Sequence, residues 1–253
     1  MLSFTERGHG PALVFLHAYP LDSSMWREQI EFFSDRYRVI APDILGFGGS
    51  QPARPWTMSQ MGDELATLLD QLGSEQCILA GLSMGGYISL PFAVSHPERV
   101  QRLVLAHTRA RADLEPEKTA RNAMIDELKR VGTATLPEKM LPRLLGPEAG
   151  EPVRSFVRAS IEKTTADADI FAVTAMRDRI DQTARLASLH CPTLVIAGSG
   201  DAILKVEDCK TMAEAIPHGQ FVVIPQTGHL SNLEDPAAFN RALDEFLRRS
   251  DSE

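Results

Sequence analysis

The chain has 253 residues, of which 43% are hydrophobic and 24% are charged, and its formal net charge is −8. This composition is typical of a globular protein with a substantial core, in one large α/β domain or two small ones, and the negative charge argues against a nucleic-acid partner. Three widely spaced cysteines fit neither a disulfide framework nor a zinc site. No signal-peptide pattern and no run of 18 apolar residues occurs, so we predict a cytoplasmic protein without membrane association.

Apolar segments alternate with amphipathic segments through the first 107 residues. The first amphipathic segment has Trp26, Ile30 and Phe33 at i, i+4 and i+7 spacing, which is typical of a helix with one buried face. The helix predicted at 58–72 ends before Gly73, a residue type that often follows a helix. Strands are predicted at 2–6, 12–17, 37–41, 77–80 and 100–106, and a further helix ends near residue 96.

This alternation stops near residue 108 and resumes near residue 190. The intervening segment contains no strand-like apolar run, and the βαβ pattern then returns. Helices are predicted at 119–131, 137–145, 153–162 and 166–178, followed by a strand at 192–198, a helix at 206–216, a strand at 220–224 and a helix at 236–248.

Strands that alternate with helices and are apolar on both faces indicate a parallel sheet covered on both sides. We therefore predict a mostly parallel α/β core formed by residues 1–107 and 190–253. Residues 108–189 are predicted to be a helical cap inserted at one edge of this core. The tail at 250–253 is predicted to be disordered.

The most informative motif is Gly81-Leu-Ser-Met-Gly85. It lies between a predicted strand and a predicted helix, which is the context in which a G-x-S-x-G sequence presents a nucleophile. Glycine at both ends leaves room for a strained turn that lifts the Ser83 hydroxyl clear of the sheet. The same turn directs the helix N-terminus and the Met84 N–H towards a developing oxyanion. Ser83 is therefore the candidate nucleophile.

A serine nucleophile needs a general base, and the base needs a carboxylate that orients it. His229 follows the last predicted strand, and Asp201 follows the strand before it. Because the carboxyl ends of parallel strands meet at one edge of a sheet, we expect Ser83, Asp201 and His229 to lie close together. Their order along the chain is also one that such triads use.

Other chemistries have weaker signals in the sequence. No H-x-H or H-x-x-x-H pair is present to ligate a catalytic metal, and the glycine-rich segment 45–50 lacks both the P-loop lysine and the G-x-G-x-x-G spacing. We therefore predict no cofactor. His17 lies beside the predicted oxyanion loop and His107 at the entrance to the cap, so both are candidate pocket residues, although a structural role is the preferred interpretation of His17.

With these residues in place, the sequence resembles the α/β-hydrolase superfamily along nearly its whole length. Phe15-Leu-His-Ala-Tyr-Pro-Leu-Asp22 resembles the F-L-H-G-F-P-L-D loop of the group that holds 3-oxoadipate enol-lactonases, small carboxylesterases and cofactor-free haloperoxidases. Pro42-Asp-Ile-Leu-Gly-Phe-Gly-Gly-Ser50 resembles that group's D-x-x-G-x-G-x-S loop. The resemblance implies the α/β-hydrolase fold and an oxyanion hole formed by the N–H groups of Tyr19 and Met84.

The resemblance also implies a serine hydrolase that cleaves carboxylic esters or lactones through an acyl-enzyme. Ser83 stands where haloalkane dehalogenases have an aspartate, and Pro20 resembles the haloperoxidase and perhydrolase pattern, which leaves perhydrolysis open as a side activity. The group usually has glycine where this chain has Ala18, and the added Cβ would displace the Tyr19 N–H if that position requires a positive φ. A small-molecule receptor that retains the fold without turnover is the alternative from a different class.

Substrate choice is expected to lie with the cap. Arg109 and Arg111 lie near its entrance, where they could bind a substrate carboxylate, although surface positions are the preferred interpretation of both. The expected partner is a small-molecule ester or lactone, and the sequence leaves a homo-oligomer open. The apolar candidates for the substrate pocket are Met124, Leu128, Met140, Phe171 and Leu230.

Overall fold

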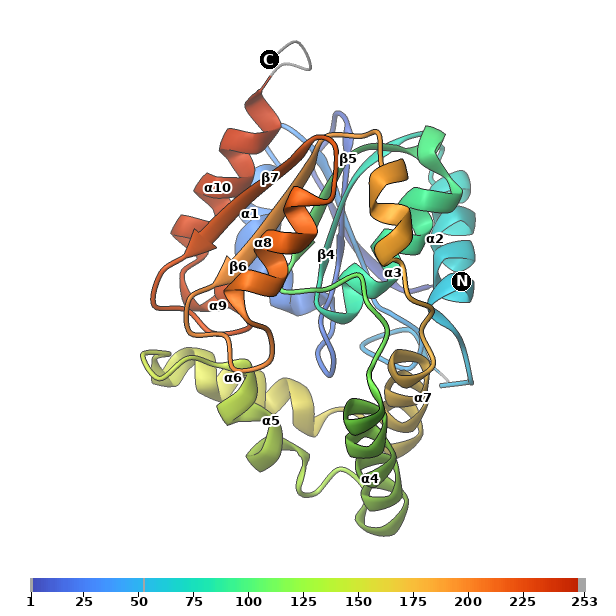
Figure 1. Ribbon diagram of the computed structural model, residues 1–253, viewed down its shortest axis with the longest axis vertical. Helices are drawn as coiled ribbons and strands as arrows, with labels where there is room; N and C mark the ends of the chain where they lie inside the picture. Colours follow the sequence, from blue (N-terminus) through green and yellow to red (C-terminus); the bar gives the residue numbers. More distant parts are fainter. Residues whose placement is uncertain (1, 52, 250–253) are drawn as a thin grey trace.

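A seven-stranded sheet in the order β1-β3-β2-β4-β5-β6-β7 forms the centre of the computed structural model, which describes residues 2–51 and 53–249 (Figure 1). β1 pairs antiparallel with β3, and every other neighbouring pair of strands is parallel. The predicted mostly parallel sheet is therefore confirmed. The strands are β1 (Phe4–Arg7), β2 (Ala12–Leu16), β3 (Arg38–Pro42), β4 (Cys77–Leu82), β5 (Val100–Ala106), β6 (Thr193–Gly198) and β7 (Gly219–Ile224).

Helices cover both faces of the sheet, as predicted. In Figure 1, α1 (Arg27–Phe33) lies behind the sheet and α8 (Val206–Glu214) lies in front of it. α1 contacts α10 (Pro236–Arg248), and a hydrogen bond of 2.9 Å from Gln29 Nε2 to Asn240 Oδ1 joins the two helices. The other helices beside the sheet are α2 (Met58–Gln71), α3 (Met84–Ser95) and the short α9 (Ser231–Glu234).

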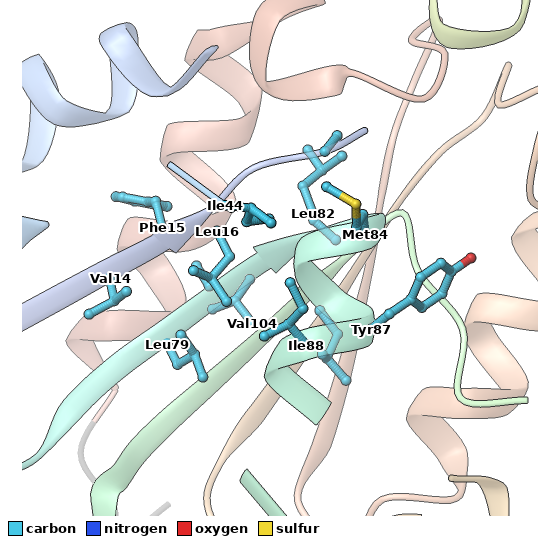
Figure 2. Packing of buried hydrophobic residues seen from close by; sticks show 14 of the residues in the cluster. Val14, Phe15, Leu16, Ile44, Leu79, Leu82, Met84, Tyr87, Ile88 and Val104 are labelled. Atoms are coloured by element: carbon cyan, nitrogen blue, oxygen red, sulfur yellow. The ribbon is translucent and has the colours of Figure 1, made fainter. Parts of the chain in front are cut away.

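The centre of the sheet is apolar on both faces, as a parallel sheet between helices requires. Phe15 of β2 points to one face, where its ring centroid lies 4.7 Å from that of Trp26. Val14 and Leu16 point to the other face, towards Ile88 of α3 (Figure 2). β2, β4 and β6 are buried along their whole length, so this core fixes the strands from whose ends the candidate site is built.

Four helices between β5 and β6 lie together at one end of the sheet, below it in Figure 1. α4 (Glu115–Val131) packs against α7 (Ala166–Arg177), and α5 (Leu136–Leu144) packs against α6 (Glu151–Glu162). Within the fully described segment 107–192 the chain forms no strand, and a short 3₁₀ helix at Thr183–Ser188 leads back to β6.

Local capping contacts set where two of the helices begin. The predicted helix at 119–131 begins at Glu115, because Pro116 lies in its first turn and Glu117 Oε2 accepts the Leu114 N–H at 2.7 Å. The helix that leads to Phe33 begins with a 3₁₀ turn at Ser23–Trp26, which Asp22 caps by accepting from the Ser24 N–H at 2.9 Å.

Three further predictions concern the cysteines, membrane spans and the tail. Cys77, Cys191 and Cys209 are unpaired. In the described residues, no helix combines the length and the apolarity needed to cross a membrane. The tail predicted to be disordered, 250–253, lies outside the described residues.

Candidate active site

Ser83 occupies a strained turn between β4 and α3. Its φ of 55° and ψ of −110° lie in a region that non-glycine residues rarely adopt. Hydrogen bonds hold this conformation on both sides, because the Ser83 N–H donates to Ala106 O at 2.9 Å and the Ser83 carbonyl accepts from Tyr87 N at 3.1 Å and Thr108 Oγ1 at 2.9 Å. The turn is therefore fixed by its neighbours rather than by Ser83 itself.

The glycines of the motif are required sterically. A Cβ at position 81 would lie 2.4 Å from Gly85 O, and a Cβ at position 85 would lie 2.2 Å from Leu16 O. Neither distance is compatible with a side chain, so α3 can approach β2 and β4 this closely only with glycine at both positions.

Asp201 and His229 meet at the ends of β6 and β7. His229 Nδ1 lies 2.8 Å from Asp201 Oδ2, and both side chains are almost fully buried. The other carboxylate oxygen, Oδ1, accepts from Ile203 N at 2.8 Å and Leu204 N at 3.0 Å. The carboxylate is thus held at both oxygens, and it fixes the orientation of the His229 ring.

A second histidine binds the same carboxylate. His107, with a φ of 48°, places Nδ1 3.0 Å from Asp201 Oδ2 and Nε2 2.6 Å from Ser231 Oγ. Burial lowers the pKa of His107, which favours the neutral ring. Burial opposes the ionisation of Asp201, but the two histidines outweigh it through charge and hydrogen bonds, so the pKa of Asp201 is lowered.

These three side chains also bring one ligand atom each within 4.8 Å of one another, close enough to be considered for a metal ion. However, both Nδ1 atoms already contact the Asp201 carboxylate, and His107 Nε2 contacts Ser231. The polar atoms are therefore satisfied by the protein, with the exception of His229 Nε2, which is buried and has no hydrogen-bond partner in the described part of the chain.

The loop that carries His229 is anchored by Glu234. The Gly228 N–H lies 3.0 Å from each oxygen of the Glu234 carboxylate, and Gly146 N donates to Glu234 Oε2 at 2.8 Å. The His229 N–H donates to Leu144 O at 3.0 Å. Glu234 therefore ties the histidine loop to the segment after α5, a role that the sequence analysis did not identify.

The predicted oxyanion donors Tyr19 and Met84 follow β2 and Ser83. Among residues 2–51 and 53–249, no hydrogen-bond acceptor contacts either backbone N–H. The backbone at Ala18 does not adopt a positive φ, so the condition under which its Cβ would displace the Tyr19 N–H does not arise. The Ala18 carbonyl accepts from Leu21 N at 2.9 Å, and its N–H lies 3.3 Å from Met25 Sδ, so alanine fits this loop without strain.

His17 and Asp43 hold this loop in place. His17 Nδ1 lies 3.0 Å from Ala18 O, and its Nε2 accepts from the Ile44 N–H at 2.9 Å. Asp43 accepts from Ser23 N at 2.9 Å and from Gly49 N at 2.8 Å, so the glycine-rich segment 45–50 wraps a carboxylate of the chain itself. Burial lowers the pKa of His17, in keeping with a neutral, structural ring.

Ser83 and His229 line one cavity of about 200 Å³, which we call the Ser83 cavity. Arg109, Met124 and Met140, which were predicted as pocket residues, are among its lining residues, together with Tyr19.

Five predicted pocket residues do not belong to this lining. His17 and His107 are buried and engaged as described, and Leu230 is fully buried in the core. Leu128 lines a separate hollow between α4 and α5, and Phe171 packs against the core. The predicted pocket was wrong for these residues. For Leu128 and Phe171 the reason is that the period of an amphipathic helix does not reveal which part of its apolar face meets a cavity.

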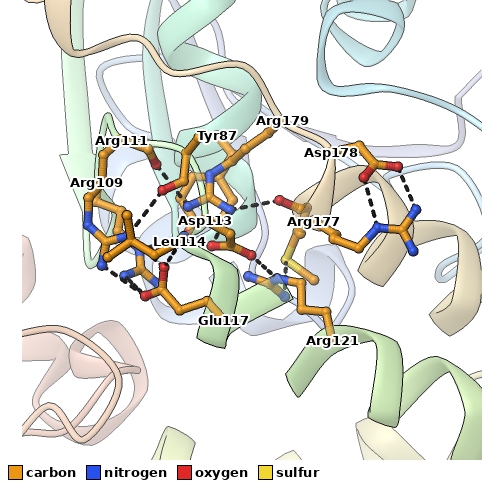
Figure 3. A network of polar contacts seen from close by, with 12 residues as sticks. Tyr87, Arg109, Arg111, Asp113, Leu114, Glu117, Arg121, Arg177, Asp178 and Arg179 are labelled. Atoms are coloured by element: carbon orange, nitrogen blue, oxygen red, sulfur yellow. Dashed lines mark hydrogen bonds and ion pairs between the residues drawn. The ribbon is translucent and has the colours of Figure 1, made fainter. Parts of the chain in front are cut away.

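A network of arginines and acids borders the Ser83 cavity (Figure 3). Asp113 binds Arg121 and also Arg179, whose Nη1 lies 2.7 Å from Asp113 Oδ1. Glu117 binds Arg109 at 2.6 Å and Arg111 at 2.6 Å. Four guanidinium groups thus share two carboxylates. Arg109, for which a surface position was the preferred interpretation, is mostly buried and lines the Ser83 cavity, whereas Arg111 is about one-third exposed and does not line it.

Two arginines of the cavity were missed by the sequence analysis. Arg121 lies three residues before Met124 on α4, and Arg143 lies three residues after Met140 on α5, and all four line the cavity. Residues three apart share a helix face, so the methionines could have identified both arginines. Arg143 has no ion-pair partner in the part of the chain that the structure describes.

The sequence and fold of this chain are similar to those of known proteins. Residues 11–236 match the family described as alpha/beta hydrolase fold. The chain is similar to 3-oxoadipate enol-lactonase 2 of Acinetobacter baylyi, with 30% identity over 94% of this chain and 89% of that protein. Among solved structures it is similar to a thermophilic esterase from Thermogutta terrifontis with malate bound (TM-score 0.94, 40% identity, 98% of this chain and 93% of that chain). It is also similar to the enol-lactonase from Burkholderia xenovorans (TM-score 0.91, 26% identity, 98% and 96%).

Proposed function

Because this chain belongs to the α/β-hydrolase fold family, and is a hydrolase, we propose that it cleaves carboxylic esters or lactones with Ser83 as the nucleophile. The observation that carries the proposal concerns His229. Its Nδ1 binds Asp201, while its Nε2 is buried, has no hydrogen-bond partner among the described residues, and belongs to a cavity that Ser83 also lines. This is the arrangement of a base that awaits a proton from a neighbouring hydroxyl.

In the proposed mechanism, His229 Nε2 takes the hydroxyl proton as Ser83 Oγ attacks the carbonyl carbon. Asp201 stabilises the imidazolium, and the N–H groups of Tyr19 and Met84 bind the oxyanion, each donor contributing roughly 3 kcal/mol in such sites. The imidazolium then protonates the leaving alcohol, which leaves an acyl-enzyme. Water activated by His229 hydrolyses the acyl-enzyme and regenerates Ser83.

The proposal is tested with p-nitrophenyl esters from acetate to decanoate. We expect turnover by the wild type and a loss of several orders of magnitude in Ser83→Ala, with normal folding by circular dichroism. Ser95→Ala, at the exposed end of the same helix, is the matched control and should retain turnover. Undiminished turnover by Ser83→Ala would contradict the mechanism, whereas ligand binding without turnover on esters or lactones would favour the receptor alternative.

A second candidate is hydrolysis of esters or lactones that carry a carboxylate. The Ser83 cavity is lined by Arg109, Arg121 and Arg143, and the last of these has no ion-pair partner in the described residues. A cluster with excess positive charge attracts an anionic substrate even though the whole chain has a net charge of −8. The enol-lactonase relative and the malate-bound esterase are consistent with this candidate.

Comparison of monoethyl succinate with ethyl butyrate tests this candidate. We expect Arg143→Gln to lower kcat/KM for the acidic ester at least tenfold and to leave that for the neutral ester within a few-fold, since a charge-assisted hydrogen bond is worth about 1.5–3 kcal/mol. Arg130→Gln, on the exposed last turn of α4, is the control. Equal effects on both esters would refute the candidate.

A further inference from the structure

A second hollow opens beside the Ser83 cavity. It lies between α4 and α5, has a volume of about 470 Å³, and is called the cap groove here. Its apolar lining includes Ala123, Leu128, Leu136 and Pro142. The volume exceeds the 200 Å³ of the Ser83 cavity, so the two spaces together can hold a much longer molecule than the Ser83 cavity alone.

The cap groove and the Ser83 cavity share four lining residues: Ala120, Met124, Met140 and Arg143. The side chains at this boundary can change conformation to admit a ligand. Alanine has a short side chain, and methionine is flexible enough to adapt its shape to a neighbour. Arg143 is exposed and has no ion-pair partner in the described residues, so its side chain can move aside at no cost in ion pairs.

The charged residues that line the cap groove but not the Ser83 cavity are already engaged. Glu127 of α4 forms an ion pair with Lys139 of α5 and accepts from Thr135 Oγ1 at 2.7 Å. Glu138 pairs with Arg158 at 2.6 Å. Apart from Arg143 at the boundary with the Ser83 cavity, the surface left for a ligand is therefore mainly apolar, and a hydrocarbon chain matches it.

A third hollow, of about 500 Å³, adjoins the Ser83 cavity on another side, between α2 and α7, but charged contacts hold the residues at its boundary. It shares only Tyr87 and Arg109 with the lining of the Ser83 cavity. Arg179 Cζ lies 4.1 Å from the Tyr87 ring centroid, and Arg109 is paired with Glu117. Opening this boundary would break a cation–π contact and an ion pair, so this hollow is the less accessible of the two.

We propose that the cap groove binds the hydrocarbon tail of the acyl group whose ester is cleaved at Ser83. The preferred substrates are then esters of medium-chain acids, with the carbonyl in the Ser83 cavity and the methylene chain between α4 and α5. This inference rests on the proposed function and assigns the cap groove as its acyl subsite. Each methylene that enters the groove raises kcat/KM by at most about fourfold.

Three proteins test the subsite on p-nitrophenyl acetate, butyrate, hexanoate and octanoate. Ala123→Trp fills the groove from an exposed helical position, so the fold is not disturbed. Ser59→Trp places the same side chain at an exposed helical position in the third hollow and is the matched control. We expect kcat/KM of the wild type and of Ser59→Trp to rise from acetate to octanoate. In Ala123→Trp the ratio of octanoate to acetate should fall at least tenfold.

A wild-type kcat/KM that does not rise with chain length would overturn the proposal. So would a result in which Ser59→Trp abolishes the rise of kcat/KM from acetate to octanoate and Ala123→Trp retains it. Calorimetric titration of the Ser83→Ala protein with octanoate measures binding to the groove without ester turnover. It therefore distinguishes failure of the acyl subsite from failure of the proposed function. Binding that Ala123→Trp weakens, and Ser59→Trp does not, supports the subsite even without ester turnover. Absence of octanoate binding, together with absence of turnover, contradicts both.

Discussion

His107 Nδ1 lies 3.0 Å from Asp201 Oδ2, the oxygen that His229 Nδ1 also contacts. Burial lowers the pKa of His107 and so favours the neutral ring, in which Nε2 accepts from the Ser231 hydroxyl and Nδ1–H donates to Asp201. The Asp201 carboxylate then receives four donors, two from histidines and two from the backbone. These donors keep it ionised in a buried position, which is the state that would stabilise a His229 cation.

His107→Asn tests this positioning role. Asparagine tolerates the φ of 48° but is too short to replace the imidazole contact with Asp201. Loss of one hydrogen bond to a charged group is worth about 1.5–3 kcal/mol, so we expect turnover of p-nitrophenyl acetate to fall roughly 10- to 100-fold, less than in Ser83→Ala. Ser231→Ala should have a smaller effect. Turnover equal to that of the wild type, in a folded His107→Asn protein, would argue against the role.

Sequence patterns alone predicted the sheet, its helical cover and the meeting of Asp201 with His229, because strands and their ends are visible as short apolar runs before loops. His107 was assigned to the pocket, because the position of β5 beside β6 depends on strand order, which local patterns do not contain. Leu128 was misplaced for a related reason. It shares the apolar face of α4 with Met124, but only the packing of α5 decides which of them reaches Ser83.

Within the arginine network, the Asp113–Arg179 ion pair joins the segment between β5 and α4 to the segment that follows α7, and both side chains are at most 4% exposed. Asp113→Ala leaves Arg179 buried without its carboxylate, so we expect the free energy of unfolding in urea to fall by about 3–5 kcal/mol. Arg111→Ala is the control, because the Arg111–Glu117 pair is about one-third exposed and should contribute less than about 1 kcal/mol. Equal losses in both variants would show that burial does not set the strength of these pairs.

Ala18→Gly restores the residue that the oxyanion loop of the group usually has. Because Ala18 does not adopt a positive φ, glycine relieves no strain and mainly adds freedom to the unfolded chain. We expect a loss of about 0.4–1 kcal/mol in the free energy of unfolding and a kcat within about twofold of the wild type. A marked gain in kcat with any ester would instead show that the alanine displaces the Tyr19 N–H.

Asp169 of α7 is fully buried, and burial raises its pKa from 3.8 to about 7, although its Oδ2 accepts from Thr164 Oγ1 at 2.7 Å. Its Oδ1 and the Tyr19 hydroxyl are both buried without a hydrogen bond of normal geometry in the described residues. The folded state therefore binds the Asp169 proton more tightly than the unfolded state does. Its contribution to stability is complete below pH 3.8 and is lost as the pH rises towards 7.

Asp169→Asn removes this ionisation while keeping the shape of the side chain. Relative to the wild type, we expect the variant to gain stability as the pH rises from 4 to 8, by an amount on the order of 4 kcal/mol at most, measured as the free energy of unfolding in urea. Asp167→Asn, exposed in the first turn of the same helix, should show little change between the two pH values. If the difference between Asp169→Asn and the wild type is the same at pH 4 and pH 8, Asp169 is ionised in the folded protein at both, and burial does not raise its pKa as the structure indicates.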